Sequence, residues 1–492
     1  MIPLLAALPL LFAFATALLI PLHRNNLTKY LFLTGAFAPW VVFLFGGEGS
    51  EVVGGWTRTG GIEVAVGPYS RWFILAELLL FSIAALYSVV YFRGKVKPFV
   101  LLLLIHTGLL GAFISRDLFN YYIYMEVVSV STFSLVAFPR DSEAKRAAYK
   151  YLMLSMISSY FFVFAVGLLY LKTGYLNLYL MSRAVTQSKE VVAAIAIAFT
   201  SLLLKAGVFP LHSWLPDANS VAPTPVVILS GITVNVPLYG MLLLSKYLPL
   251  SIHFKTALTS IAFVSMFVGA GMALLQRDAK RLLAYSTVSQ MGYALIGLGT
   301  GNLLGAVYYS FAHAIIKGGL FLSVGSLSDA RGSRRLDALS YRGDTLIAVS
   351  VIALSLAIGG VSPFVSALGK AELLRGLTWG RWLFYLAGVG TLAAFAKLNY
   401  WLSRGVGVGV AGVYRFLSIV PPLLVVVFGL YLYRALQPLD VVIVGAGILT
   451  FALLRLSGLT GRGIGFDLPV GRDVSINAAL YALFLLFLLH VL

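Results

Sequence analysis

The stretch AIAIAFTSLLLKAGVFPLHSW, residues 194–214, is an apolar run of membrane-spanning type with a charge inside it. Lys205 lies near its middle, where a charged side chain is costly unless it is paired, hydrated or neutralised. Gly207 and Pro210 follow in the same run, so the helix is expected to break just beyond the lysine. A charge beside a helix break at this depth predicts a functional site.

The composition is that of an all-α polytopic membrane protein. Of the 492 residues, 60% are hydrophobic and 11% charged, and apolar runs of about 20 residues recur along the chain. Little polar sequence separates these runs, so no soluble domain is expected. The first run has no basic segment before it and no small-residue cleavage site after it, which favours a retained helix over a signal peptide.

About sixteen runs are long and apolar enough to predict membrane spans. They cover residues 2–22, 29–46, 71–92, 98–115, 117–138, 148–172, 190–215, 222–246, 252–275, 282–299, 303–326, 343–377, 380–403, 413–432, 438–457 and 474–491. The long runs 190–215 and 343–377 contain Gly and Pro near their middles, so both are expected to be discontinuous helices.

The net charge of +18 comes from basic residues scattered through short loops. Roughly 21 of the 36 lie in loops that follow odd-numbered spans, which predicts a plasma-membrane protein with those loops in the cytoplasm and both termini outside. This pattern, without aromatic-basic motifs, argues against nucleic-acid binding. Because the sequence has no cysteine, we expect no Cys-ligated iron–sulfur cluster or other cofactor on this chain.

Several ionisable residues lie inside the predicted spans, and Glu126 is the natural partner of Lys205. It occupies the middle of DLFNYYIYMEVVSVSTFSLVAF, residues 117–138. A structural carboxylate bound to nearby hydroxyls is the alternative, but acids at mid-span more often serve an ion path. Opposite charges stabilise each other's ionised forms, whereas desolvation favours the neutral forms. A pair that opens and closes would therefore change how firmly the lysine holds its proton.

Two further groups carry charge in the second half of the chain. His313 and Lys317 are four residues apart in YYSFAHAIIKGGLFLSVGS, which places them on one helix face and favours a proton relay over a structural histidine. Lys370 follows the second broken run, and paired interrupted spans are typical of internal-repeat transporters. The alternative for Lys370 is a lysine that reaches the interface beside Glu372 and Arg375.

Three other in-span groups favour structural interpretations. Lys397 lies near the end of its span and can extend to the interface. Glu77 lies near the start of its span, close to Arg71, and His106 stands alone in its run.

Four ordered motifs resemble those of the antiporter-like subunits of complex I, Mrp antiporters and membrane-bound hydrogenase and sulfane reductase complexes. They are KAGVFPLHSWLPDANSVAPTPV (205–226), DAKRLLAYSTVSQMGYALIGLG (278–299), FAHAIIKGGLFLSVGS (311–326) and GGVSPFVSALGKAELL (359–374). The resemblance covers roughly residues 70–405 and implies 14–16 helices with two inverted five-helix repeats, each with one broken helix. It implies N-terminal helices over 1–97, repeats over 98–250 and 251–405, and C-terminal helices over 406–492.

The resemblance also implies roles for single residues. Glu126, Lys205, His313 and Lys317 correspond to the family's translocation row, and Lys370 to its terminal exit group. His212, Asp217 and Lys397 are expected at most to support the path. One position departs from the family, because Asn235 stands where many members have a lysine or histidine. Asparagine can hold water by hydrogen bonds but does not carry a proton at neutral pH.

These expectations lead to one main hypothesis and two alternatives. The main one is an ion-translocating subunit of a redox complex, with membrane partners that include further antiporter-like subunits and a module carrying iron–sulfur clusters. The alternative is the large subunit of an Mrp-type sodium/proton antiporter without redox activity. A third interpretation, which Asn235 supports, is a degenerate copy that acts as a spacer. The sequence leaves the ion, proton or sodium, open.

Overall fold

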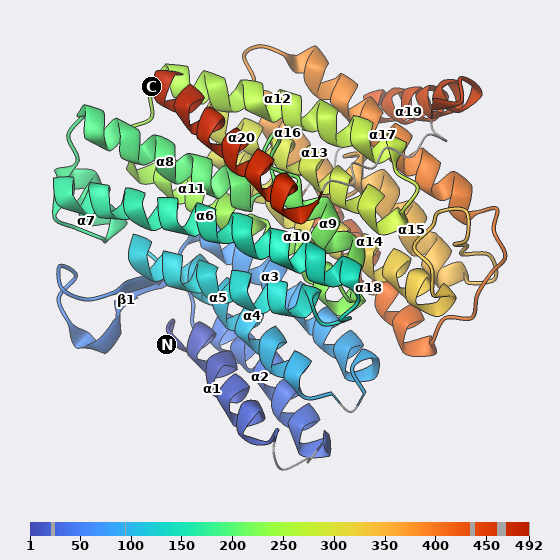
Figure 1. Ribbon diagram of the computed structural model, residues 1–492, viewed down its shortest axis with the longest axis horizontal. Coiled ribbons are helices and arrows are strands. Elements are labelled where there is room, and N and C mark those ends of the chain that lie inside the picture. The colour runs from blue at the N-terminus through green and yellow to red at the C-terminus, as the bar shows by residue number, and fades with distance from the viewer. Residues whose placement is uncertain (21–24, 94, 433–437, 460–468, 492) are drawn as a thin grey trace. The chain divides into compact units, whose positions relative to one another are not determined.

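The computed structural model describes the chain apart from residues 21–24, 94, 433–437, 460–468 and 492 (Figure 1). Within the described chain, ten helices are long and apolar enough to cross a membrane. The chain divides into two compact units. Unit 1 comprises residues 1–206, 232–254 and 470–492, and unit 2 comprises residues 207–231 and 255–469.

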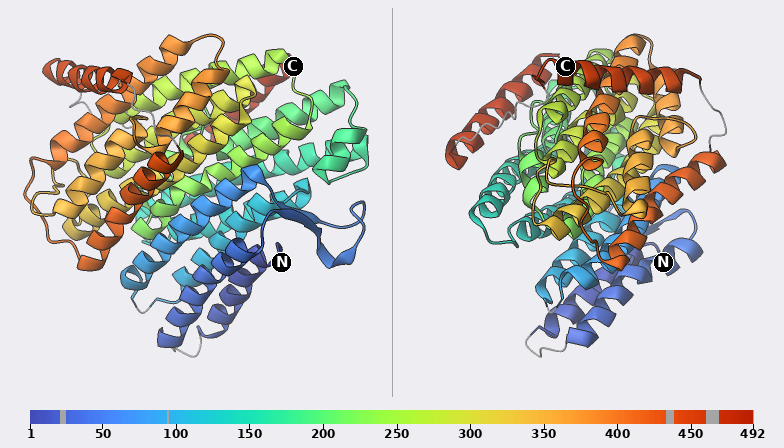
Figure 2. Two further views of the ribbon diagram at one scale, coloured as in Figure 1. Left: turned by 180° about the vertical axis from the view of Figure 1, so that it is seen from behind. Right: turned by 90° about the vertical axis from the view of Figure 1, so that its right-hand side faces the viewer.

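Unit 1 is a bundle of helices with one small hairpin. Its helices are α1 (Leu4–Leu18), α2 (Asn25–Phe45), α3 (Pro68–Tyr91), α4 (Lys97–Ile114), α5 (Leu118–Val136), α6 (Ser142–Thr173), α7 (Leu178–Ala184), α8 (Lys189–Lys205), α11 (Asn235–Tyr247) and α20 (Val470–Val491). Strands β1 (Gly49–Val52) and β2 (Glu63–Val66) pair antiparallel, with a 3₁₀ turn at Val53–Gly55. The hairpin is visible as the pair of dark blue arrows in Figure 2. The sequence analysis did not predict it.

Unit 2 is a second helical bundle. It contains α9 (Trp214–Val221), most of α10 (Thr224–Thr233) and of α12 (Ile252–Leu275), then α13 (Ala279–Thr300), α14 (Leu303–Arg331), α15 (Thr345–Ile358), α16 (Val365–Gly376), α17 (Arg381–Leu402), α18 (Gly412–Leu432) and α19 (Pro438–Leu456). Helix α14 is central, because its apolar window is buried all round. A helix buried on every side needs apolar residues at nearly every position, so His313 and Lys317 on α14 are exceptions.

Side-chain caps fix where several helices begin. Asp117, Asp141 and Asp278 precede α5, α6 and α13, and each carboxylate accepts a hydrogen bond from a backbone N–H in the first turn. Such caps satisfy donors that have no partner within the helix. Gly174 and Gly301 end α6 and α13 with positive φ angles, which glycine adopts without steric penalty.

Both predicted discontinuous spans are broken in the structure. Residues 190–215 form α8, a turn and the start of α9, and residues 343–377 form α15, a turn and α16. The two turns share the pattern Gly-Val-x-Pro, as GVFP at 207–210 and GVSP at 360–363. In both, the glycine has positive φ and the proline follows a cis peptide bond. We call these turns the first break and the second break.

The predicted span 222–246 is also divided, into α10 and α11. Pro237 has no N–H to donate to the carbonyl of Thr233, which lies four residues earlier. The regular hydrogen-bond pattern is interrupted there, and α11 begins at the buried Asn235.

Candidate ion-translocation site

Unit 1 contains a buried ion pair. Lys205 Nζ lies 2.7 Å from Glu126 Oε1, and it also donates hydrogen bonds to the hydroxyls of Ser129 at 3.0 Å and Ser155 at 3.2 Å. The Ser159 hydroxyl donates to the same carboxylate oxygen. An ammonium group has three N–H donors, so all three are used by one carboxylate and two hydroxyls.

Three helices place these groups by simple spacing. Glu126 and Ser129 lie one turn apart on α5, and Ser155 and Ser159 lie one turn apart on α6. Lys205 is the last residue of α8, where unpaired carbonyls favour a positive charge. The site is therefore assembled from one short face of each helix.

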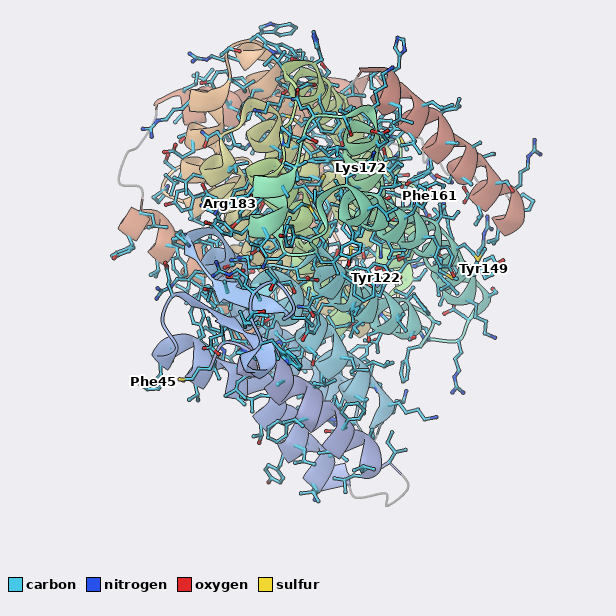
Figure 3. All side chains as sticks on the ribbon, turned by 90° about the vertical axis from the view of Figure 1, so that its left-hand side faces the viewer. Phe45, Tyr122, Tyr149, Phe161, Lys172 and Arg183 are labelled. Atoms are coloured by element: carbon cyan, nitrogen blue, oxygen red, sulfur yellow. The ribbon has the colours of Figure 1, made fainter. Side chains whose placement is uncertain are left out.

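The two charges differ in how far they are removed from the surface of the unit. The Lys205 side chain is 6% exposed and the Glu126 side chain 25%. Tyr122 lies one turn before Glu126 on α5 and is visible with Phe161 of α6 on the face of unit 1 shown in Figure 3. The carboxylate thus has access to the surroundings of this unit that the lysine lacks, so a change outside this face can reach the pair.

Helix α20 contacts two of the helices that form this site, α6 and α8. Asp473 of α20 forms an ion pair with Lys150 of α6 at 2.7 Å. Tyr481 shares a hydrogen bond of 2.9 Å with Ser201, one turn before Lys205 on α8, and its ring packs against Phe161. Figure 1 shows α20 in red across α6 and α8. Both helices that hold the lysine side of the pair are therefore fixed to α20.

In unit 2, Lys317 is bound by neutral groups. Its ammonium donates to the carbonyl of Leu283 at 2.6 Å and to the Ser286 hydroxyl of α13. It also lies 5.8 Å from the ring centroids of Phe321 and Phe395. Aromatic faces and carbonyl oxygens attract a cation without neutralising it, so this lysine differs from Lys205.

His313 lies one turn before Lys317 on α14 and is 2% exposed. Neither of its ring nitrogens has a protein hydrogen-bond partner within the described chain. Most buried polar groups are paired, and an unpaired imidazole retains both sites for proton exchange. The face that carries these two residues therefore holds an unpaired imidazole and a lysine bound by neutral groups, rather than an ion pair.

Lys370 lies on α16, directly after the second break. Its ammonium donates to the carbonyl of Gly359 at 2.6 Å and lies 4.4 Å from the centroid of the Tyr293 ring. The neighbouring Glu372 and Arg375 pair with each other at 2.5 Å. Lys370 thus binds back onto the break and is 7% exposed, rather than extending to an interface.

The expected supporting residues have mixed surroundings. Asp217 forms an ion pair with Arg281 at 2.7 Å, and the His212 ring packs against Phe209 and Tyr285. Asn235 is fully buried at the start of α11. Asp217 and His212, which follow the first break, therefore help to support the fold beside it.

Two structural expectations were wrong. Lys397 does not extend to the interface, because it is 1% exposed and its ammonium donates to the carbonyls of Leu274 and Gln276. Helix α12 ends there, and its unpaired carbonyls attract a cation. His106 does not stand alone, since its Nδ1 lies 2.6 Å from Glu77 Oε1 with both side chains fully buried.

Sequence reasoning missed the residues that complete these sites. Serines are common in membrane helices, so nothing marked Ser129, Ser155 and Ser159 beyond their one-turn spacing. Lys150 and Asp473 are far apart in sequence. Asp440 at the start of α19 was also missed, although its carboxylate accepts the backbone N–H of Ser362 in the second break at 2.8 Å.

Comparison with known proteins places the chain in a family. Residues 115–395 match the family described as NADH:quinone oxidoreductase/Mrp antiporter, TM. NADH-quinone oxidoreductase subunit N of Desulforudis audaxviator is 32% identical over 409 residues, which is 77% of this chain and 81% of that protein. The putative antiporter subunit mnhD2 of Staphylococcus aureus (strain JH9) is 28% identical over 401 residues, 76% of this chain and 79% of that one.

A solved structure has the same fold. It is that of the membrane-bound sulfane sulfur reductase, an archaeal respiratory membrane complex; one of its chains matches with a TM-score of 0.80 at 24% identity, over 94% of this chain and 99% of that chain. This chain is an antiporter-like, multi-pass membrane subunit and belongs to the NADH:quinone oxidoreductase/Mrp antiporter family.

Proposed function

We propose that this chain is the ion-translocating subunit of a membrane-bound redox complex and that the ion is a proton. The observation that carries the proposal is the pair Glu126–Lys205, which closes at 2.7 Å beside a break in a membrane span. A lysine and a carboxylate at this distance can pass a proton between them, and the only other hydrogen-bond partners of Lys205 Nζ and Glu126 Oε1 in the described chain are the hydroxyls of Ser129, Ser155 and Ser159.

The pair can work as a switch. While closed, Glu126 stabilises the charged lysine. When a partner subunit draws the carboxylate away, the desolvated ammonium loses its counter-charge and gives up its proton more readily. The partly exposed Glu126 is the side of the pair that such a partner can reach, whereas Lys205 is held inside by Ser129 and Ser155.

The groups of unit 2 suit the later steps of the same path. His313 has two nitrogens for accepting and releasing a proton, and Lys317 is a cation without a carboxylate partner among the ion pairs of the described chain. Lys370 is the proposed exit group at the second break. Asn235 is proposed to hold water on the way, because its amide donates and accepts hydrogen bonds but does not titrate.

The proposed function implies two kinds of partner subunit. Further membrane subunits would cover the face that carries Glu126. A redox module with iron–sulfur clusters would supply the energy, since the sequence has no cysteine to ligate such a cluster itself. The proposed location is the plasma membrane, with both termini outside.

The second candidate is an Mrp-type sodium/proton antiporter subunit, and the similarity to mnhD2 supports it. The two candidates differ in what co-purifies with the chain. Iron–sulfur subunits, detected by mass spectrometry and iron content of the intact complex, support the redox proposal. A complex made only of membrane subunits without iron supports the antiporter.

The test of translocation is Lys205→Ala in the assembled complex, with proton uptake measured in sealed vesicles. We expect flux to fall at least tenfold, because the carboxylate is left without its cation. Lys172→Ala is the matched control, since Lys172 pairs with Glu190 at 3.4 Å and both are exposed. Undiminished flux in Lys205→Ala, with the complex intact, would refute the proposal and favour the spacer.

A further inference from the structure

A cavity opens beside the second break, within unit 2. Its volume is about 320 Å³. The backbone of the break forms one wall, and Lys370 and Arg375 of α16, Arg381 of α17 and Asp440 of α19 form the others. A space of this size holds several water molecules, and polar walls keep them in place.

The side-chain carboxylate of Asp440 is hydrogen-bonded to the backbone of the second break. Its Oδ2 accepts the N–H of Ser362 at 2.8 Å, and Ser362 precedes the proline of the Gly-Val-Ser-Pro turn. Asp440 also lies in the first turn of α19, where a negative charge is stabilised by the helix dipole. Two independent features therefore place an anionic oxygen at this wall.

The three basic residues around the cavity differ in the partners that bind them. Arg375 pairs with Glu372, and Arg381 donates to the carbonyl of Leu377 at 3.1 Å. Lys370 has the carbonyl of Gly359. Lys370 and Asp440 thus line the same cavity without a direct ion pair between them in the described chain. This arrangement suits a proton donor and an acceptor linked through water rather than a structural ion pair.

We propose that Asp440 accepts, through water in this cavity, the proton that Lys370 releases. The ammonium loses a proton and becomes an amine; the carboxylate gains it, becomes a carboxylic acid, and passes it to outside water. The inference deepens the proposed function and rests on it. It also makes α19, which lies beyond the matched residues 115–395, a part of the exit.

A purely structural Asp440 would only cap the break. Asp440→Asn separates the two roles, because its amide oxygen still accepts the Ser362 N–H while the charge is lost. Asp440→Glu keeps the charge and shifts it by one methylene. Asp440→Ala removes both roles. We expect proton flux in vesicles to fall at least threefold in Asp440→Asn and to stay within twofold of wild type in Asp440→Glu.

Asp337→Asn is the matched control. Asp337 is a loop carboxylate whose pKa is lowered by its hydrogen bond with Arg335, and it is 48% exposed. Wild-type flux in Asp440→Asn, with Asp440→Ala alone impaired, would leave only the cap and overturn the inference. If Lys205→Ala abolishes flux in the same preparation, the proposed function survives that result; if Lys205→Ala has no effect, the proposed function itself fails.

The water in the cavity has its own test, which does not depend on pumping. Since the sequence has no cysteine, a single Ala371→Cys variant reports on this wall alone, and Ala393→Cys, fully buried on α17, is the control. We expect a membrane-impermeant thiol reagent to modify residue 371 at least tenfold faster than residue 393, from one side of the membrane only. Equal, slow modification of both would overturn a water-connected exit.

Discussion

The two breaks share one backbone pattern and use it in opposite ways. At the first break the lysine precedes the glycine: Lys205 ends α8 and meets a carboxylate from α5. At the second break the lysine follows: Lys370 lies on α16 and binds back onto the carbonyl of Gly359. The same turn thus lies beside an ion-paired lysine in one case and beside a lysine bound by a backbone carbonyl and an aromatic ring in the other.

The two breaks also differ in which group accepts the backbone N–H of the residue before the proline. In the first break, Phe209 donates to the Ser265 hydroxyl at 3.3 Å. In the second break, Ser362 at the corresponding position donates to the Asp440 carboxylate. The acceptor in the first break is a neutral hydroxyl, which adds no charge there. The counter-charge of Lys205 therefore comes from Glu126. In the second break the acceptor is a carboxylate, the group that we propose receives the proton from Lys370.

The largest effect is expected from a substitution that fills the space occupied by the Lys370 side chain at the second break. Gly360→Ala adds a methyl group at positive φ, at a point 2.3 Å from Lys370 Cδ. The lysine stem has to leave the break, so we expect proton flux to be lost. Gly207→Ala is the counterpart. Its φ is also positive, but its new methyl group meets the tip of the Leu215 side chain at 2.9 Å, which can move.

Both changes carry the backbone penalty of a left-handed residue, about 1–2 kcal/mol. Flux in vesicles, normalised to assembled complex, separates that shared penalty from the loss at Lys370. If the two variants are impaired equally, the breaks do not differ in the way proposed.

Glu126→Gln is expected to have the next largest effect. The amide keeps an oxygen for the Ser159 hydroxyl but no longer neutralises Lys205. Loss of one partner from a buried pair destabilises by about 3–5 kcal/mol, and the partial exposure of Glu126 places this change at the low end. We expect a severalfold drop in flux with assembly retained, measured beside Glu190→Gln at the exposed pair. Normal flux in Glu126→Gln would favour the spacer interpretation.

The smallest expected effect concerns the contact of α20 with α8, the helix that carries Lys205. Tyr481→Phe removes the hydrogen bond to Ser201 and keeps the ring packing against Phe161. A hydrogen bond of this kind contributes about 1 kcal/mol. We expect a small decrease in thermal stability of the purified complex and unchanged flux. A large loss of flux would mean that α20 takes part in translocation.

The sequence predicted the elements that depend on local pattern. Apolar length predicted the membrane helices, and Gly with Pro inside two of the longest runs predicted both breaks. Lys205 was marked because a charge in an apolar run is costly, and the same reasoning selected Glu126 as its partner. These inferences need only the order of residues along one or two spans.

What the sequence could not supply depends on distant contacts. Asp440 is brought to the second break by α19, and nothing in its own surroundings in the sequence indicates that contact. Lys397 appeared able to reach the interface because its span position was known, whereas the open end of α12 that binds it was not. Glu77 and His106 looked unrelated because they lie on different predicted spans, 29 residues apart, and Glu77 has Arg71 nearer to it in the sequence.

The division of unit 1 along the chain has a consequence for how the protein is made. The unit needs α20, which begins at residue 470, whereas the helices that α20 braces are complete by residue 205. At a ribosomal rate of about 5–20 residues per second, that interval lasts on the order of tens of seconds. Lys205 and Glu126 are therefore synthesised before α20 exists. Their helices lack the contacts with α20 until the second unit has been synthesised.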